Sequence, residues 1–377
     1  MRSDLIVFGE DWGGLPSSTQ HLVRHLGESR KVLWVNSIGL RKPRLAVSDF
    51  RRAVDKVFSR RAGDTAVASD HGPDFTVVNP KTIPAPSGSV ERSIARGLLR
   101  RQLKPAIREA GLHNPILWIS LPTAVDLVGE LGEAATVYYC GDDFSALAGV
   151  DHDTVAARER ELSAKADLVI TASEVLAGRF PAPKTRLLSH GVDYQLFSTP
   201  AARAPDFPAN GKPVAGFYGS LSEWLDIELL LATIRRMPHW EFVFIGNASV
   251  DVSALAALTN VHMLGSRPHR ELPGYSQHWD VSLLPFRDNA QIRACNPLKL
   301  SEYLAAGRPI VSTPFPALEA YAELVSTVRS PDEMVTALEA GRSGANCNDD
   351  AQKRRNSVAH LSWRARAERV SDWLEAI

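Results

Sequence analysis

Cysteine is scarce in this chain of 377 residues. Its three cysteines, Cys140, Cys295 and Cys347, lie far apart and lack the short spacings that hold a metal ion. This scarcity argues against a disulfide framework and against a cysteine-based metal site. We therefore interpret the three thiols as reduced and mostly structural.

Long apolar runs are absent as well. The apolar run near the N-terminus, residues 5–8, is far too short for a signal peptide, and no segment approaches the roughly 20 apolar residues of a membrane helix. We therefore expect a cytoplasmic protein. Hydrophobic residues still make up 44% of the chain, so its length predicts about two domains, each with its own core.

The chain has no net charge, but its charges are unevenly distributed. Residues 1–110 contain 19 Lys and Arg against 11 Asp and Glu. A basic helix is expected around residues 50–61, and a second one over residues 90–108, where Pro105 is a possible end or kink. In the second helix five cations recur at every fourth position, and we expect four aliphatic residues to face inward. The cations are Arg92, Arg96, Arg100, Lys104 and Arg108, and the aliphatic residues are Val90, Ile94, Leu98 and Leu99.

Five like charges on one stripe repel one another unless an anion neutralises them. An anionic membrane surface or a lipid-phosphate acceptor would do so, and we favour this interpretation slightly over a solvated helix face. Nucleic acid is a poorer partner, because the stripe has no interleaved aromatic residues and the whole chain is neutral.

Short apolar strands alternate with helix-length segments through the first half of the chain. The expected strands are residues 5–8, 32–35, 75–78, 116–119, 137–139 and 168–171. This alternation predicts a parallel, doubly wound α/β sheet, in which ligands bind beyond the carboxyl ends of the strands. Gly13 and Gly14 follow the first strand in this way. Asp142 and Asp143 follow the fifth, either as an acid pair that acts on a substrate or as a local turn or helix cap.

The second half repeats the alternation after a segment rich in Pro and Gly, residues 199–213. Strands are expected at residues 214–218, 242–245, 261–264 and 281–284, and Gly219, Gly246 and Gly265 follow the first three of them. The composition of residues 199–213 is that of a linker, so a domain boundary is predicted there.

Residues 296–313 contain the most informative pattern in the chain. Asn296 is a good N-cap, Pro297 suits the first helical position, and Gly307 suits a left-handed C-cap before a short buried strand. Lys299 and Glu302 are three residues apart and share one side of this helix. A cation and a carboxylate near a helix N-terminus suit a ligand with both phosphate and sugar hydroxyls, although a surface ion pair would have the same spacing.

This segment resembles the nucleotide-binding helix of GT-B glycosyltransferases, especially the retaining family 4. The resemblance covers most of the chain and is weakest between about residues 40 and 110. It implies two Rossmann-like domains facing each other across a cleft, an N-terminal acceptor domain (1–198) and a C-terminal donor domain (214–355). Residues 356–377 would form a helix that returns to the N-terminal domain.

The resemblance also implies roles for individual residues. Glu302 would bind both ribose hydroxyls of a nucleotide-sugar, Arg293 and Lys299 would neutralise its diphosphate, and Asn296 would help to hold the donor sugar. The positions implied around the ligand are Gly13 and Gly14 at the cleft, Gly219 where the donor domain opens, and Gly246 and Arg267 near the base. Asp142 and Asp143 would orient the acceptor or act as a base.

Three departures from the family pattern are visible. Ala294 occupies the position of another Glu, residues 222–226 replace an expected basic phosphate clamp, and His190 stands where Asn is usual. These departures bear on the identity of the donor and on the stereochemistry of transfer more than on the fold.

The function that the resemblance implies is transfer of a sugar from a nucleotide-sugar to a glycan or lipid-linked glycan in surface polysaccharide synthesis, with retention favoured. The donor would be a UDP-sugar or GDP-sugar. We expect no cofactor and no essential metal, because no Asp-x-Asp pair follows a strand of the donor domain. A cytoplasmic enzyme that contacts the inner face of the membrane is expected. A nucleotide-sugar 2-epimerase and a non-catalytic nucleotide-sugar-binding protein are the alternatives.

Overall fold

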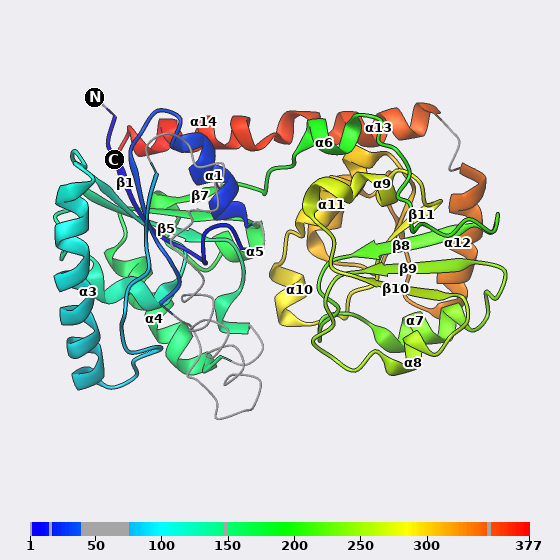
Figure 1. Ribbon diagram of the computed structural model, residues 1–377, viewed down its shortest axis with the longest axis horizontal. Helices are drawn as coiled ribbons and strands as arrows, with labels where there is room; N and C mark the ends of the chain where they lie inside the picture. Colours follow the sequence, from blue (N-terminus) through cyan, green and yellow to red (C-terminus); the bar gives the residue numbers. More distant parts are fainter. Residues whose placement is uncertain (1, 15–16, 39–74, 147–149, 345–347) are drawn as a thin grey trace. The chain divides into compact units, whose positions relative to one another are not determined.

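The computed structural model describes residues 2–14, 17–38, 75–146, 150–344 and 348–377 (Figure 1). The basic helix expected around residues 50–61 lies outside these ranges. The chain forms two compact units. Unit 1 comprises residues 1–171, 177–187 and 367–377, and unit 2 comprises residues 172–176 and 188–366.

Unit 1 is built on a seven-stranded parallel sheet with the order β3-β2-β1-β4-β5-β6-β7. Its strands are β1 (Leu5–Phe8), β2 (Val32–Val35), β3 (Phe75–Val78), β4 (Ile116–Ile119), β5 (Ala135–Cys140), β6 (Leu168–Thr171) and β7 (Thr185–Leu187). The first six confirm the sequence prediction. Strands β1, β2, β4, β5 and β6 are buried along their whole length, because a parallel sheet is covered on both faces. The described helices of this unit include α1 (Ser18–Leu26), α3 (Ser89–Glu109) and α4 (His152–Lys165).

Helix α3 turns a different face to the core from the one predicted. It buries Ala95, Leu99 and Leu103, whereas the ridge of Val90, Ile94 and Leu98 is 70%, 50% and 41% exposed. The inward orientation predicted for these three residues was therefore wrong. Pro105 lies inside the helix and does not end it.

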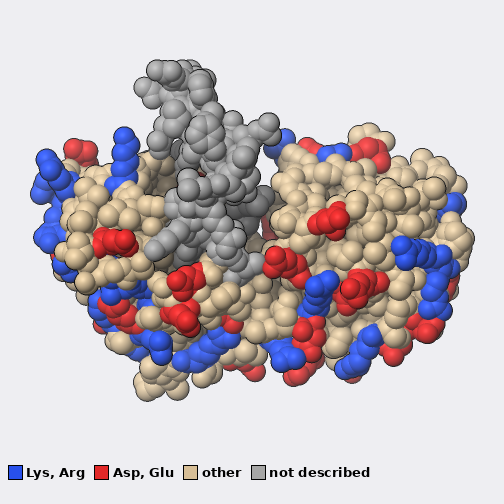
Figure 2. Space-filling view, turned by 90° about the horizontal axis from the view of Figure 1, so that it is seen from below, with Lys and Arg blue, Asp and Glu red and all other residues tan. Residues whose placement is uncertain are grey.

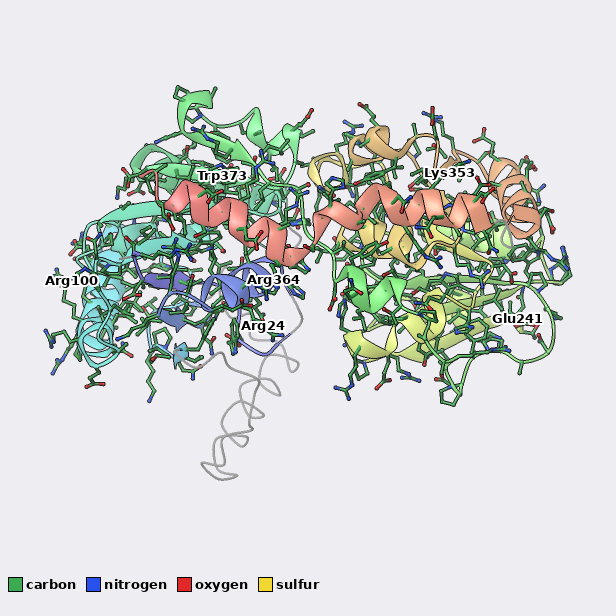
Figure 3. The ribbon with its side chains drawn as sticks, turned by 90° about the horizontal axis from the view of Figure 1, so that it is seen from above. Arg24, Arg100, Glu241, Lys353, Arg364 and Trp373 are labelled. Carbon is green, nitrogen blue, oxygen red and sulfur yellow. The ribbon has the colours of Figure 1, made fainter. Side chains whose placement is uncertain are left out.

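The basic stripe of α3 is also partly neutralised within the protein. Arg92 pairs with Asp126 and Glu161, while Arg96 and Arg100 both lie near Glu130 (3.8 and 3.1 Å; Figure 3 labels Arg100). The acids come from distant parts of the chain, from the 3-10 turn η1 (Pro122–Leu127) and the loop after it, and from α4. For these three cations part of the neutralising charge is therefore supplied by the protein itself.

Unit 2 is built on a six-stranded parallel sheet with the order β10-β9-β8-β11-β12-β13. Its strands are β8 (Val214–Tyr218), β9 (Glu241–Ile245), β10 (Val261–Gly265), β11 (Val281–Leu284), β12 (Ile310–Ser312) and β13 (Ser326–Thr327). Its helices are α6 (Tyr194–Ser198), α7 (Ile227–Ile234), α8 (Ser253–Ala256), α9 (Pro273–Ser276), α10 (Ala290–Ala294), α11 (Leu298–Ala306), α12 (Pro331–Gly344) and α13 (Asn348–Val358). Packing is tight at Gly216, where an added Cβ would lie only 1.7 Å from the Trp279 ring.

Residues 199–213, predicted as a linker, belong to unit 2. The amide of Ala204 donates to the Gly274 carbonyl (3.0 Å), and the amide of Ala201 donates to Gln277 Oε1 (2.9 Å). Ahead of these residues, the second segment of unit 1 ends at Leu187, eleven residues before the predicted boundary at residue 198.

The last helix, α14 (Trp363–Leu374), begins in unit 2 and has its final turns in unit 1. There the fully buried side chain of Arg30 donates from Nη2 to Ser371 Oγ (2.8 Å) and Glu375 Oε1 (3.3 Å). In the described part of the chain no helix has the length and apolar character needed to cross a membrane.

Candidate functional site

Helix α11 places the residues singled out by the sequence pattern. It begins at Leu298, with Pro297 as its N-cap, and no side chain caps its N-terminus. Gly307 forms the predicted left-handed C-cap, with φ of 86°. Asn296, predicted as the N-cap, instead donates from Nδ2 to the Ala172 carbonyl (3.2 Å). The amide of Leu300 donates to the Pro297 carbonyl (3.0 Å), so within the described chain it is the amides of Leu298 and Lys299 that remain available to an anionic ligand, as at other uncapped helix ends.

The Glu302 carboxylate is held on both of its oxygens. Tyr218 donates its hydroxyl to Oε2 (2.7 Å), and His269 Nε2 lies 2.8 Å from Oε1. The Glu302 side chain is 12% exposed, so its orientation is fixed before any ligand arrives. Each carboxylate oxygen has two lone pairs, so each can still accept another hydrogen bond.

His269 was not predicted from the sequence. Burial tends to lower its pKa, but the hydrogen bond and charge of Glu302, together with the charge of Asp193, outweigh burial and raise the pKa above its ordinary value. The imidazole therefore retains its proton to higher pH than a free histidine. His269 and Glu302 lie 33 positions apart, so no local spacing could have paired them.

Lys299 lies where the strand order of unit 2 changes direction. From β8 the chain proceeds to β9 and β10 on one side, and from β11 to β12 and β13 on the other; such switch points are the usual ligand sites of parallel sheets. Lys299 Nζ lies 5.5 Å from the ring centre of Phe217 on β8 and 5.7 Å from that of Phe286, just after β11. Burial lowers the pKa of Lys299, more than the charges of Cys295 and Glu302 raise it. Among the described residues its ammonium has no hydrogen-bond partner, which suits an incoming anion.

Gly219 and Gly246 form a close pair after the neighbouring strands β8 and β9. Their φ angles are +131° and +138°, which L side chains rarely adopt. A Cβ on Gly246 would lie 2.1 Å from the Gly219 carbonyl oxygen, and a Cβ on Gly219 would lie 2.8 Å from Lys299 Cε. Because neither residue has a side chain, the backbones of Gly219 and Gly246 and the side chain of Lys299 can lie close together at the switch point.

The other two predicted cations are engaged by acids. Arg293, 62% exposed, binds Asp288 through Nε (2.6 Å) and Nη2 (2.9 Å). Arg267 donates to Asp206 (2.6 Å) and lies 3.2 Å from the Tyr275 hydroxyl. Their roles in holding a diphosphate or a base stay predictions, because each would first have to exchange its present partner.

Ala294 lies in the interior of unit 2. It is fully buried, and its carbonyl accepts a hydrogen bond from Ser173 Oγ (2.6 Å). No side chain at this position can therefore contact a donor sugar.

In unit 1, the glycine loop after β1 is tied into its own surroundings. Gly13, with φ of +76°, donates its amide to Gln20 Oε1 (3.3 Å), and Gly14 donates to the Asp11 carbonyl (3.1 Å). The loop is thus rigid, but the amides of both glycines already have acceptors.

The two aspartates predicted as catalytic make local structural contacts. Asp143 is 2% exposed and accepts hydrogen bonds from Arg179 Nη2 (2.5 Å) and Ser145 Oγ (2.7 Å). Burial tends to raise its pKa, but these bonds outweigh burial and lower the pKa, which makes Asp143 a weak base. Asp142 accepts from the Asp143 amide (2.8 Å), as in a turn.

Glu10, directly after β1, is the carboxylate in unit 1 that the sequence analysis missed. Burial raises its pKa, although hydrogen bonds to its own backbone and to Ser17 oppose the shift. Within the described ranges its buried Oε2 has no hydrogen-bond partner. A polar residue directly after a central strand was the available signal.

The comparisons with known proteins agree with this geometry. The profile of the family described as "Glycosyl transferases group 1" matches residues 212–340, which contain the whole of β8 to β12 and α11. Residues 212–340 thus resemble a group 1 glycosyltransferase domain. TuaH of Bacillus subtilis (strain 168), named as a teichuronic acid biosynthesis glycosyltransferase, is 28% identical over 247 residues, 58% of this chain and 61% of TuaH. The chain thus matches about three fifths of the length of this curated relative.

Solved structures extend the likeness to the whole chain. Sucrose-phosphate synthase from Thermosynechococcus elongatus has a TM-score of 0.72 at 17% identity, covering 100% of this chain and 99% of the other. Anabaena HepE, solved with UDP and glucose, has a TM-score of 0.68 at 13% identity and covers 100% of both chains. The likeness of the whole chain to these structures identifies its fold as GT-B.

Proposed function

We propose that the protein is a glycosyltransferase that moves a sugar from a nucleotide-sugar to a glycan or lipid-linked glycan during synthesis of a surface polysaccharide. The observation that carries the proposal is the site on α11, where Glu302 is oriented by two donors and where Lys299, near an uncapped helix N-terminus, has no hydrogen-bond partner among the residues that the structure describes. The naming of TuaH for teichuronic acid synthesis supports the polysaccharide context.

In this proposal the ribose of the donor binds Glu302. Its two hydroxyls would donate to the lone pairs that His269 and Tyr218 leave on the carboxylate. Because HepE was solved with UDP, a UDP-sugar is the first donor to test, and a GDP-sugar is the second.

The diphosphate would meet Lys299 and the first turn of α11. Glycosyl transfer builds negative charge on the departing nucleoside diphosphate, so a preorganised cation and helix dipole lower the barrier. We propose that no essential metal ion takes part, which activity in the presence of EDTA would test. In the described part of the chain no three His, Cys, Asp or Glu side chains are grouped to hold a metal ion.

The acceptor would be a lipid-linked glycan, with the protein in peripheral contact with the inner face of the cell membrane. The family resemblance favours retention at the anomeric carbon. The anomeric configuration of the product, read by proton NMR, decides between retention and inversion.

A non-catalytic nucleotide-sugar-binding protein is the second candidate, and Ala294 favours it. The buried alanine leaves the donor sugar without one carboxylate contact that the family pattern has. Binding without release of nucleoside diphosphate, across a panel of acceptors that includes a membrane extract, would establish this alternative.

The test of the main proposal uses Lys299→Met with Arg293→Met as its matched control. Methionine keeps the length of the lysine side chain and removes a partly buried ammonium that has no hydrogen-bond partner among the described residues, so Lys299→Met should fold about as stably as the wild type. Release of UDP or GDP from the donor should nevertheless fall by about 10²-fold or more, in line with losing one charge stabiliser. Arg293→Met should lose far less activity than Lys299→Met, since that cation is exposed and would have to leave Asp288 before it could bind the diphosphate. Equal turnover by wild type and Lys299→Met would refute the proposed site.

A further inference from the structure

We propose that the exposed ridge of α3 docks onto the surface of an anionic lipid bilayer. The ridge is formed by Val90, Ile94 and Leu98, spaced four residues apart, with exposed fractions of 70%, 50% and 41%. The proposal identifies the part of the protein that would make the peripheral membrane contact. It rests on the proposed function only for the biological role of that contact.

The ridge is unusual for the surface of this protein. The large hydrophobic residues exposed in the described part of the chain number six, and three of them lie on this one line of one helix. The opposite side of α3 is already packed into unit 1 through Ala95, Leu99 and Leu103. The side chains of the ridge therefore lie largely outside the packing of the described part of unit 1, and a contiguous exposed apolar line marks an interaction surface.

Charge on the same face decides the kind of partner. Arg101 and Arg108 follow Ile94 at intervals of seven residues, so they continue its line toward the helix C-terminus. Neither has a hydrogen bond or ion pair with any residue that the structure describes. In Figure 2, Lys and Arg side chains gather at the outer edge of unit 1, where α3 lies.

Acids balance only part of the charge on this helix. The helix contains six Lys and Arg but only two acids, Glu91 and Glu109. Glu91 lies at the N-terminus and accepts hydrogen bonds from the Ser87 and Gly88 amides (3.0 and 3.5 Å). Arg96 and Arg100 share the single carboxylate of Glu130.

Aliphatic side chains beside free arginines suit the boundary between acyl chains and anionic headgroups. Aliphatic groups enter the apolar boundary, while arginines remain at the level of the phosphates. A neutral protein partner would offer no negative charge to Arg101 and Arg108, so the charge pattern favours the anionic bilayer.

Flotation with lipid vesicles tests the proposal on the full chain. Vesicles of phosphatidylcholine are compared with vesicles that also contain phosphatidylglycerol. Ile94→Ser/Leu98→Ser tests the ridge, and Leu187→Ser is its matched control, because Leu187 is also in unit 1 and is 40% exposed. Arg101→Gln/Arg108→Gln tests the charges, with Arg24→Gln on α1 as the control.

The wild type should float with the anionic vesicles, and both α3 double variants should lower the bound fraction at least fivefold while the controls do not. The proposal is overturned if the wild type floats with neither vesicle, or if loss of the ridge leaves binding unchanged. It is also overturned if the ridge variant instead abolishes a concentration-dependent dimer, because the occupant would then be a second copy of the chain.

The donor site provides an independent control. Stabilisation by nucleotides depends on unit 2 and should be equal in the wild type and in all α3 variants. Vesicle binding without any nucleotide response would count against the proposed function alone, whereas a nucleotide response without vesicle binding would count against the docking ridge alone.

Discussion

Substitution of Glu302 separates its structural contribution from its proposed contact with ribose. In Glu302→Ala the Tyr218 hydroxyl and the His269 imidazole both lose their acceptor, at distances that are now 2.7 and 2.8 Å. Tyr218 is only 4% exposed, so its hydroxyl cannot turn to bulk water. An orphaned buried donor costs about 1–3 kcal/mol, and the His269 side chain, which is 25% exposed, should cost less, so we expect a loss of about 2–4 kcal/mol in the free energy of unfolding.

For a unit of this size, each kcal/mol lowers the unfolding midpoint by about 2–4 °C. Glu302→Ala should therefore unfold several degrees below the wild type. The amide of Glu302→Gln can still accept from one of the two donors, so this variant should lose roughly half as much stability.

Binding of the nucleotide supplies the second readout. If both ribose hydroxyls donate to the carboxylate, removing it should weaken the affinity for UDP or GDP by about 10²-fold, since hydrogen bonds to charged groups contribute about 1.5–3 kcal/mol each. Tyr218→Phe is the control, because it removes one hydrogen bond from Glu302 and leaves the carboxylate in place. We expect it to lose about 1 kcal/mol of stability and to bind the nucleotide nearly as well as the wild type.

Calorimetric titration of each variant with UDP and GDP, beside thermal unfolding, measures both effects. The reasoning is refuted if Glu302→Ala is destabilised as expected yet binds the nucleotide as tightly as the wild type. The carboxylate would then be a structural anchor for Tyr218 and His269 alone.

Three further predictions follow from the described contacts. Because the pKa of His269 is raised, the stability that it draws from Glu302 is fully present below the ordinary value of 6.5 and is lost as pH rises through the folded value. Thermal unfolding of wild type and His269→Gln should therefore differ most at acid pH, and a constant difference would contradict this. The pKa of Asp143 is lowered, so its contribution is present above the ordinary value of 3.8 and is lost as pH falls through the folded value. Asp143→Asn should cost about 1–3 kcal/mol in urea unfolding at neutral pH, and lost activity with unchanged stability would make it catalytic instead. Gly246→Ala should cost about 2–5 kcal/mol by the same assay, because its Cβ would meet the backbone at 2.1 Å, whereas Gly265→Ala, with no atom within 4 Å, should cost only about 1–2 kcal/mol.

Local patterns were sufficient to predict most of the sheet and the end of α11. Apolar strands separated by helix-length segments predict parallel sheets, because a buried parallel strand must be apolar on both faces. Gly307 was predictable as a C-cap because a left-handed residue favours glycine. Lys299 and Glu302 share a turn of helix, so their proximity also follows from spacing alone.

Contacts between distant segments were not predictable in this way. The orientation of α3 shows why: Val90, Ile94 and Leu98 have the same four-residue spacing as the buried residues, so periodicity reveals a face but not which side the core lies on. The acids that pair with Arg92 lie 34 and 69 positions away. The donors to Glu302 were missed for the same reason, since Tyr218 is 84 positions distant.

The placement of the last turns of α14 has a consequence for synthesis on the ribosome. Arg30 needs Ser371 and Glu375 as partners, and these are made 341 and 345 residues later. At a translation rate of about 5–20 residues per second, the Arg30 guanidinium lacks these partners for on the order of tens of seconds, while all of unit 2 is translated. Unit 1 is started before unit 2 and completed after it, so a nascent chain that stalls before α14 leaves the earlier-made unit open to chaperones and proteases.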